Sequence, residues 1–356
     1  MDSIRVVGFG AMNLDELYRV QSVLADDETP IKEHKSTPGG SAANTIYGLA
    51  KLGINTGFIG AIGSDEAGRL LLQDFDSVGT DCSQVRIKEG ATTGSVLGLT
   101  DKYGKRALYV APGANSLLAR EDISLEHMEQ AELIHLSSFV DDLQFELQKW
   151  VVNNLPLSVK ISFTPGAIYA RKGINVLDPL LSKTDILFVN QNEIKELTGA
   201  DFTAAGAAAQ YFLDRGCQIV VVTLGKGKWQ RMNKSQLMLE FDKQRNTPLG
   251  DINSNNHVAS DNEVELFGIP TSYVADANNA YWIESQPKYG KDTTGAGDAF
   301  AAGFLYGLLN GKGFEECGRI GNIVARFSIT KVGARQGLPT LIELSRRYQE
   351  LYNEQL

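Results

Sequence analysis

The stretch KDTTGAGDAFAAGFLYGLL, residues 291–309, places one carboxylate between small residues and an apolar helix. Gly295, Ala296 and Gly297 have little or no side chain, so their amides can approach an anion closely. A helix beginning near residue 298 adds its positive end. Asp298 would repel an anion, but it is well placed to take a proton from a hydroxyl that attacks one. The pattern predicts phosphoryl transfer to an alcohol, and a helix cap behind a turn is the alternative.

Polar residues in the first fifty positions could hold the acceptor. Asp15 follows the first apolar run and could bind two hydroxyls of a polyol. Gly39 and Gly40 leave the backbone bare before a helix, and Asn44 offers both a donor and an acceptor. Each of these residues, taken singly, is also an ordinary turn or cap residue.

Two further motifs follow predicted strands. Asn190 and Glu193 in NQNE could form an outer shell for Mg²⁺, which prefers oxygen ligands and keeps its waters. An Asn N-cap with a Glu in the first helical turn is the alternative. Thr223, Gly225 and Gly227 in TLGKG could contact the phosphates or ribose of a nucleotide.

Two glycine-rich stretches argue against other nucleotide folds. GFGAMN (8–13) has Asn13 where a dinucleotide fingerprint needs its third glycine, so the sequence disfavours a nicotinamide cofactor. LGKGKW (224–229) lacks the spacing of a Walker-type phosphate loop.

The elements that carry these motifs alternate between strand and helix patterns. Such alternation predicts an α/β fold with a parallel sheet covered on both faces, and ligands at the carboxyl ends of its strands. The predicted strands are 4–9, 56–63, 131–139, 158–163, 185–190 and 217–225, and the predicted helices lie within 39–53, 65–79, 141–154, 173–183, 191–199 and 203–216.

Two regions depart from this alternation. Residues 16–20, 31–37 and 90–111 alternate apolar and polar positions around the hairpin signal DKYGK, which predicts a small antiparallel sheet beside the main one. Residues 233–265 are rich in Asn, Ser, Asp and Lys, which predicts a surface insertion. The insertion is either peripheral or has a role in partner binding or substrate gating.

Composition limits the class of protein. The chain has 356 residues, 43% hydrophobic and 22% charged, with a net charge of −9, which is typical of a globular protein and argues against a nucleic-acid partner. No apolar run is long enough to span a membrane, and the first residues do not resemble a signal peptide. Three scattered cysteines fit a reducing compartment, so we expect a cytoplasmic protein without a membrane partner.

Four stretches together resemble the PfkB, or ribokinase-like, carbohydrate kinase family. DTTGAGDAFAAGF (292–304) resembles its C-terminal signature and PGGSAANTIYGLAKLG (38–53) its N-terminal signature. NQNE resembles the family's NxxE motif, and VVTLGKGK resembles its nucleotide strand and loop. The four occur in the family's order and cover nearly the whole chain.

The resemblance implies a three-layer α/β/α sandwich with a small β-sheet lid, formed by about 10–37 and 90–111. It also implies transfer of the γ-phosphoryl group of ATP to an alcohol group of a sugar, with Asp298 as general base and the 295–297 backbone as anion hole. By resemblance, the acceptor residues are Asn13, Asp15, Gly39, Gly40 and Asn44, and the ATP residues are Asn190, Thr223, Gly225, Gly227 and Asn322. Glu193 and Asn190 would place Mg²⁺ through water, and Asp292 with the 333–337 loop would hold a monovalent cation such as K⁺.

The sequence also departs from the family pattern. Thr164 stands where many relatives have Asp, and Lys291 stands where an apolar residue is usual. Contacts between residues 230 and 290 cannot be carried over, because the stretch is longer than the family needs.

The acceptor stays open between free sugars, sugar phosphates and nucleosides. An adenosine-like nucleoside kinase is the main alternative, and a non-catalytic sugar-sensing protein is a third. Leu97 and Leu99 could pack a nucleobase or the lid of a second subunit, which would give a homodimer. A phosphorylated sugar would need a basic residue aimed at its phosphate, and the basic residues of the predicted hairpin tip are Lys102, Lys105 and Arg106.

Overall fold

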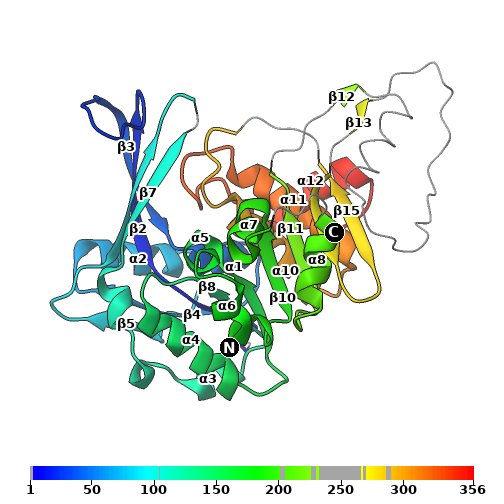
Figure 1. Ribbon diagram of the computed structural model, residues 1–356, viewed down its shortest axis with the longest axis horizontal. Helices are drawn as coiled ribbons and strands as arrows, with labels where there is room; N and C mark the ends of the chain where they lie inside the picture. Colours follow the sequence, from blue (N-terminus) through cyan, green and yellow to red (C-terminus); the bar gives the residue numbers. More distant parts are fainter. Residues whose placement is uncertain are drawn as a thin grey trace.

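A nine-stranded sheet forms the centre of the described part of the chain (Figure 1). The computed structural model describes residues 3–103, 105–200, 205–225, 230–231, 266–267, 270–285 and 290–356. Across the sheet the strands are β15 (Ala280–Glu284), β14 (Pro270–Ala275), β11 (Ile219–Thr223), β10 (Ile186–Asn190), β9 (Lys160–Thr164), β8 (Leu133–Ser137), β1 (Val6–Phe9), β4 (Thr56–Gly63) and β5 (Val85–Lys88).

The strands from β5 to β11 are parallel, as the alternation predicts, but β14 and β15 are antiparallel. The sheet is therefore mixed rather than wholly parallel. A tight turn explains the difference, because Asp276 Oδ1 accepts hydrogen bonds from the amides of Asn278 and Asn279 and joins the two strands as a hairpin.

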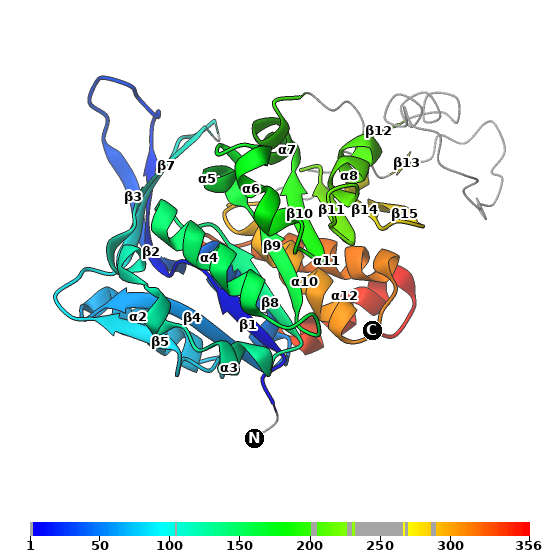
Figure 2. The same ribbon diagram turned by 60° about the horizontal axis from the view of Figure 1, so that its bottom comes forward.

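Helices cover both faces of the sheet, which confirms the three-layer sandwich. One layer contains α1 (Ser41–Lys51), α2 (Glu66–Asp76), α10 (Ala296–Leu309), α11 (Phe314–Ser328) and α12 (Leu341–Tyr352). The other contains α3 (Leu125–Glu129), α4 (Asp142–Asn154), α5 (Gly166–Ala170), α6 (Ile174–Leu181), α7 (Gln191–Thr198) and α8 (Ala205–Leu213). Figure 2 shows α3 and α4 against one face of the sheet, with α10 to α12 on the other side of the sheet.

The strand pattern explains why an apolar core lies on each face of the sheet. Successive side chains of a strand point to opposite faces, so Val6 and Val7 of β1 are both fully buried but belong to different apolar clusters. Val7 packs with the α3 to α8 layer and Val6 with the layer of α1, α2 and α10. A strand buried on both faces reads as a continuous apolar run, which is what VVGF shows.

Helix α10 lies inside its layer, packed between α1 and α11. Its residues from Ala299 to Leu305 are all buried, in keeping with a helix that is apolar all round. A Cβ at Gly303 would lie 2.9 Å from the Cα of Gly321 in α11, so the two helices can approach only because both positions lack a side chain. This packing fixes the position of the first turn of α10.

A separate four-stranded sheet projects from the body at the left of Figure 1. Its order is β3 (Ile31–Gly39), β2 (Asn13–Val20), β6 (Gly94–Thr100) and β7 (Arg106–Ala111). The expectation of an antiparallel sheet is wrong at one pair, because β2 and β6 run parallel. In the chain, β2 follows β1 and β6 follows β5. Because β1 and β5 run in the same direction in the main sheet, β2 and β6 leave the body in the same direction.

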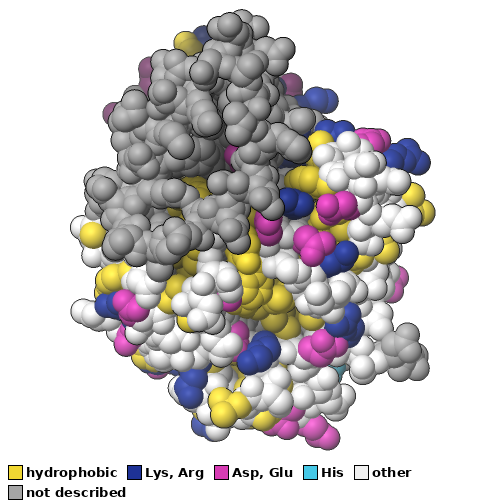
Figure 3. All heavy atoms as spheres, turned by 90° about the vertical axis from the view of Figure 1, so that its right-hand side faces the viewer, with side chains coloured by type: hydrophobic (Ala, Val, Ile, Leu, Met, Phe, Trp, Pro, Cys, Tyr) yellow, Lys and Arg dark blue, Asp and Glu magenta, His cyan; other side chains and the backbone are white. Residues whose placement is uncertain are grey.

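A two-stranded sheet completes the described strands. β12 (Gln230–Arg231) pairs with β13 (Leu266–Phe267), and the predicted insertion at 233–265 lies outside the described residues. On the face in Figure 3, acidic and basic side chains are interspersed over the described atoms rather than gathered by sign. Among the described residues, no helix is both long and apolar enough to cross a membrane.

Candidate active site

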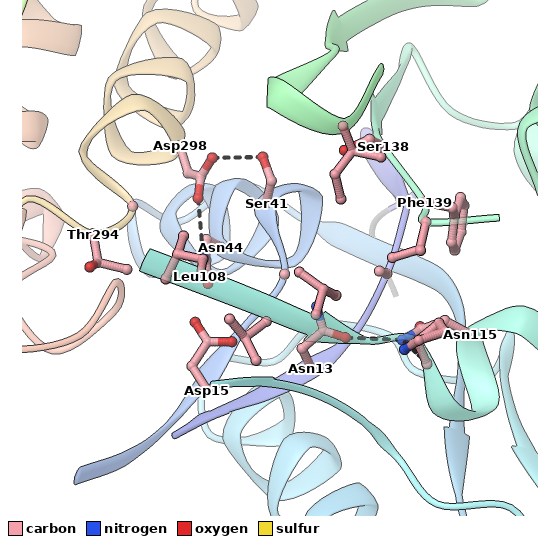
Figure 4. Close-up of a pocket in the computed structure, with 18 of the residues that line it drawn as sticks. Asn13, Asp15, Ser41, Asn44, Leu108, Asn115, Ser138, Phe139, Thr294 and Asp298 are labelled. Carbon is pink, nitrogen blue, oxygen red and sulfur yellow. Dashed lines mark hydrogen bonds between the residues drawn. The ribbon is translucent and has the colours of Figure 1, made fainter. Parts of the chain in front are cut away.

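A cavity of about 250 Å³ lies between the four-stranded sheet and the body of the molecule (Figure 4). Six of the residues expected from the sequence line it: Asn13, Asp15, Gly40, Asn44, Gly295 and Asp298. The apolar part of its wall comprises Ala11, Leu17, Val96, Leu108, Val110, Pro112, Phe139, Val140 and Ile168. Segments from both ends of the sequence therefore meet at one hollow.

The carboxylate of Asp298 is held by two donors from α1. Ser41 Oγ donates to Oδ1 at 2.7 Å, and Asn44 Nδ2 donates to Oδ2 at 2.9 Å (Figure 4). Helix α10 begins at Ala296, two residues before the expected start, so Asp298 lies in its first turn. Burial raises the pKa of Asp298, while the two hydrogen bonds and a nearby arginine oppose the rise.

The start of α10 has the features expected of an anion cradle. Gly295 has a φ of 71°, and no side chain caps the helix. The Ala296 amide donates to the Thr293 carbonyl at 3.2 Å, and the Ala299 amide donates to the Gly295 carbonyl at 2.8 Å. The Gly297 and Asp298 amides fall between these and have no intrahelical partner. A Cβ at Gly297 would meet no atom within 4 Å, so an anion can reach this backbone.

Asp15 faces the same cavity from the lid sheet. It lies within β2 rather than just after the first strand, and it is 8% exposed. Its Oδ1 has no hydrogen-bond partner among the described residues, and burial raises its pKa to about 7. A Cβ at Gly39 would lie 2.2 Å from Oδ1, so glycine is required beside this carboxylate. An unpartnered buried acceptor in a cavity fits a hydroxyl-bearing ligand.

Asn13 is positioned by a second asparagine. Asn115 Nδ2 donates to Asn13 Oδ1 at 3.0 Å, while Asn115 Oδ1 accepts from the Met12 amide at 2.9 Å (Figure 4). Gly40 closes the turn before α1 with a φ of 96°, and a Cβ there would lie 2.1 Å from the Ala11 carbonyl oxygen. Both residues line the cavity as expected.

The residues expected to bind the nucleotide lie at the carboxyl edge of the main sheet. Asn190 and Thr223 are register partners at the ends of β10 and β11. Gly225 follows with a φ of 85° and open space at its Cβ position, whereas Gly227 lies outside the described residues. This group does not line the cavity beside Asp298.

Asn190 and Glu193 form a capping box at the start of α7. Asn190 Oδ1 accepts from the Glu193 amide, and Glu193 Oε2 accepts from the Asn190 amide, both at 3.0 Å. The N-cap alternative from the sequence is therefore realised. Burial raises the pKa of Glu193 to about 7, and the charge of Asp298 adds to the rise. Oxygen donors at this edge fit the hydrated shell of a magnesium ion.

Asn322 and Asp292 are the remaining residues that the sequence analysis assigns to ATP and to a monovalent cation. Asn322 is 7% exposed in α11; its Oδ1 accepts from Thr271 Oγ1 at 3.0 Å, and its Nδ2 has no partner among the described residues. Asp292 accepts from the Thr294 amide and, through Oδ2, from the Gly333 amide, each at 2.9 Å. The expected proximity of Asp292 to the 333–337 loop is thus present.

Three residues of this region have no role in the sequence analysis, namely Ser41, Asn115 and Arg335, and Arg106 appears there only as a basic residue of the predicted hairpin tip. Arg106 lines the cavity and donates from Nη1 to Thr294 Oγ1 at 3.0 Å, so it connects the lid to the body. Ser41 follows the glycine pair at a helix start, which was the one available signal. Arg335 is 2% exposed and donates from Nε to Asn44 Oδ1 at 2.9 Å.

Of the two predictions for Leu97 and Leu99, packing against a nucleobase in this cavity is wrong, because neither residue lines it, and contact with a second subunit stays a prediction. The lid residues that line the cavity include Val96, Leu108 and Val110. Because side chains alternate along a strand, Leu97 and Leu99 point to the outer face of the lid, where Leu97 is 41% exposed.

Comparisons with known proteins bear on the family to which the chain belongs. The family model for the pfkB family carbohydrate kinases matches residues 3–228 and 271–341. An uncharacterized sugar kinase from Archaeoglobus fulgidus is 36% identical over 302 residues, covering 83% of this chain and 100% of the relative. An ATP-dependent ribose-1-phosphate kinase from Halopiger xanaduensis is 29% identical over 333 residues, 93% of this chain and 94% of the relative.

A solved structure supports the fold. Arabidopsis thaliana ribokinase, complexed with ribose and ATP, superposes with a TM-score of 0.74 at 21% identity, covering 97% of this chain and 98% of that chain. The chain belongs to the pfkB family of carbohydrate kinases. It is a sugar-kinase-class enzyme with a ribokinase-like fold, whose relatives include sugar and nucleoside kinases.

Proposed function

We propose that this enzyme transfers the γ-phosphoryl group of ATP to an alcohol group of a sugar. The observation that carries the proposal is the convergence of Asp298, the bare amides at the start of α10 and the unpartnered Asp15 carboxylate around one cavity. A base, an anion cradle and a hydroxyl-binding acid are the three parts that such a reaction needs.

In the proposed reaction, an acceptor hydroxyl bound near Asp15 attacks the γ-phosphorus. The new O–P bond forms as the bond to the ADP oxygen breaks, and the hydroxyl proton passes to Asp298. The Gly297 and Asp298 amides stabilise charge on the transferred oxygens. Ser41 and Asn44 keep the Asp298 carboxylate in one orientation, since each of its oxygens accepts one of their hydrogen bonds.

ATP and Mg²⁺ fit the residues at the carboxyl edge of the main sheet. We assign the ATP phosphates to the edge formed by Asn190, Thr223 and Gly225. We assign the adenine to the side of Asn322, because the unpartnered Nδ2 of this residue can donate to a purine nitrogen. Mg²⁺, bound there through water by Asn190 and Glu193, would neutralise phosphate charge during transfer. The 333–337 carbonyls with Asp292 are the proposed place for a monovalent cation.

The charges around the cavity favour a neutral acceptor. Asp15, Asp141 and Asp298 line it against Arg106, the one arginine on its wall within the described residues. A phosphorylated sugar would have to place its phosphate among these acids, which costs free energy through like-charge repulsion.

A nucleoside is the second candidate, and the apolar wall favours it. Leu108, Phe139 and Ile168 offer more apolar surface than a free pentose can use. A nucleobase lying against this apolar wall would bury that surface, while the ribose hydroxyls reach Asp15.

An acceptor panel tests the proposal. ADP release from Mg-ATP would be measured with D-ribose, ribose 1-phosphate, ribose 5-phosphate, adenosine and inosine. We expect turnover with a neutral acceptor, and Asp298→Asn should lower it by about 10² to 10⁴-fold while binding persists. Asp214→Asn, an exposed carboxylate at the end of α8, is the control. Undiminished turnover in Asp298→Asn would remove Asp298 from the proposed mechanism.

A further inference from the structure

We propose that Arg335 is a positioning residue for phosphoryl transfer, acting on Asp298 through the side-chain amide of Asn44. Arg335 Nε donates to Asn44 Oδ1 at 2.9 Å, and Asn44 Nδ2 donates to Asp298 Oδ2 at 2.9 Å. The inference rests on the proposed role of Asp298 as the base. It concerns a residue that reaches the reacting atoms only through another side chain.

The amide of Asn44 needs a partner that fixes which way it faces. Its oxygen and nitrogen are similar in size, and a flipped amide would turn Oδ1 toward the Asp298 carboxylate and repel it. A guanidinium can only donate hydrogen bonds, so Arg335 is compatible only with the Asn44 orientation in which Oδ1 faces the arginine. The NH₂ group is then directed at Asp298.

Arg335 is itself held from several sides. Its Nη1 donates to Asp74 Oδ2 at 2.6 Å, and its Nη2 donates to the Gly39 carbonyl at 3.0 Å. The guanidinium carbon lies 5.3 Å from the ring centre of Tyr47 and 5.1 Å from that of Phe75. Because the side chain is 2% exposed, these contacts are shielded from water and give it a single position.

The same guanidinium is linked to Asp15 on the acceptor side, although it does not itself line the cavity. Gly39, whose carbonyl it binds, lies against the Asp15 carboxylate. The charge of Arg335 lowers the pKa of both Asp15 and Asp298, opposing the effect of burial. Other charged groups near these two acids are Arg106 on β7, Asp141 before α4, Glu193 on α7 and Asp292 before α10. Arg335 therefore favours the ionised form of the base.

Lysine and methionine substitutions separate charge from geometry. Arg335→Lys keeps a positive charge but cannot donate in three fixed directions, whereas Arg335→Met loses both. We expect Arg335→Met to lower kcat by roughly tenfold or more and to move the acidic limb of the kcat–pH profile to higher pH. Arg335→Lys should lower the kcat plateau with a smaller displacement of that limb.

The matched control is Arg319→Met. Arg319 in α11 also pairs with a carboxylate, Glu315 at 2.6 Å, and lies over an aromatic ring, Tyr352 at 4.8 Å, but it does not line the cavity. Its loss should leave kcat and the pH profile unchanged. ADP release would be followed with the acceptor from the panel above that gives the highest turnover.

A double-mutant cycle with Asn44→Ala decides whether Arg335 acts through Asn44. If it does, Arg335→Met should cost much less in the Asn44→Ala background than in the wild type. Equal losses in both backgrounds, with no displacement of the acidic limb, would assign Arg335 a structural role and overturn the proposal. Should Arg335→Met fail to fold by circular dichroism, Arg335→Lys takes its place in the cycle. Full turnover in Asp298→Asn would instead refute the base assignment itself.

Discussion

Ser41 Oγ lies 2.7 Å from Asp298 Oδ1, although 257 positions separate the two residues in the sequence. The contact joins the first residue of α1 to the first turn of α10, so the two signature stretches meet at the carboxylate of the proposed base. The protonation of that carboxylate therefore depends on side chains from both halves of the chain.

Ser41→Ala should move the pH dependence of turnover. The lost hydrogen bond favours the ionised carboxylate, so the pKa of Asp298 should rise further. The acidic limb of the kcat–pH profile would then lie at higher pH, with a greater loss of rate at pH 6 than at pH 9. Ser83→Ala, which removes a hydroxyl bonded to Asp81 at the surface, is the control and should leave the profile in place.

Asp15→Asn should change the pH dependence of stability. The pKa of Asp15 is 3.8 in an unfolded chain and about 7 in the fold, so the folded state binds more protons between these values. Wild-type stability should consequently fall as the pH rises from about 4 to about 7, and this contribution should be absent in Asp15→Asn.

At pH 8 we expect Asp15→Asn to be more stable than the wild type by on the order of 1 to 3 kcal/mol, a gap that closes near pH 4. Urea unfolding at both pH values would measure it. Asp15→Asn should also weaken acceptor binding, because the amide offers one acceptor oxygen where the carboxylate offers two, and its NH₂ group can only donate. A pH-independent stability difference would show that Asp15 does not titrate as stated.

Two glycines of the C-terminal signature should respond differently to alanine. Gly297→Ala adds a methyl group where no atom lies within 4 Å, so the fold should be kept or gain about 0.5 to 1 kcal/mol from helix propensity. The methyl group should nevertheless obstruct the anion cradle and lower kcat. Gly295→Ala should unfold at lower temperature, because its φ is 71° and a Cβ would lie 2.4 Å from the Ala334 Cβ. Thermal melts with parallel rate assays distinguish the two.

Arg106→Ala should loosen the lid. Arg106 is bonded to Thr294 Oγ1, which joins β7 to the loop before α10. We expect the KM for the acceptor to rise roughly three- to tenfold, with a smaller change in kcat, and faster amide exchange in β6 and β7. Arg19→Ala is the control on the same sheet, because the Arg19–Glu33 ion pair at 3.8 Å is exposed and does not reach the body. Equal effects of both variants would contradict the lid contact.

The sequence by itself determined the fold class and most of the proposed site. Alternating strand and helix patterns predict the sandwich, since each pattern reports which side of an element is buried. The sequence also predicts features that depend on local geometry alone, such as the turn at Gly295 ahead of Asp298. The parallel pairing of β2 with β6 was not, because a strand's own pattern does not record the direction of its neighbour.

Only the tertiary structure decided which distant side chains touch. Arg335 lies in the 333–337 loop, and nothing in the local sequence indicates that its guanidinium is buried against Asn44 and Asp74. The sequence places Arg106 near a hairpin tip, and only the packing of the lid against the body brings it to Thr294. The physical reason is that hydrogen bonds and burial between remote segments arise from packing, which a chain's local spacing does not encode.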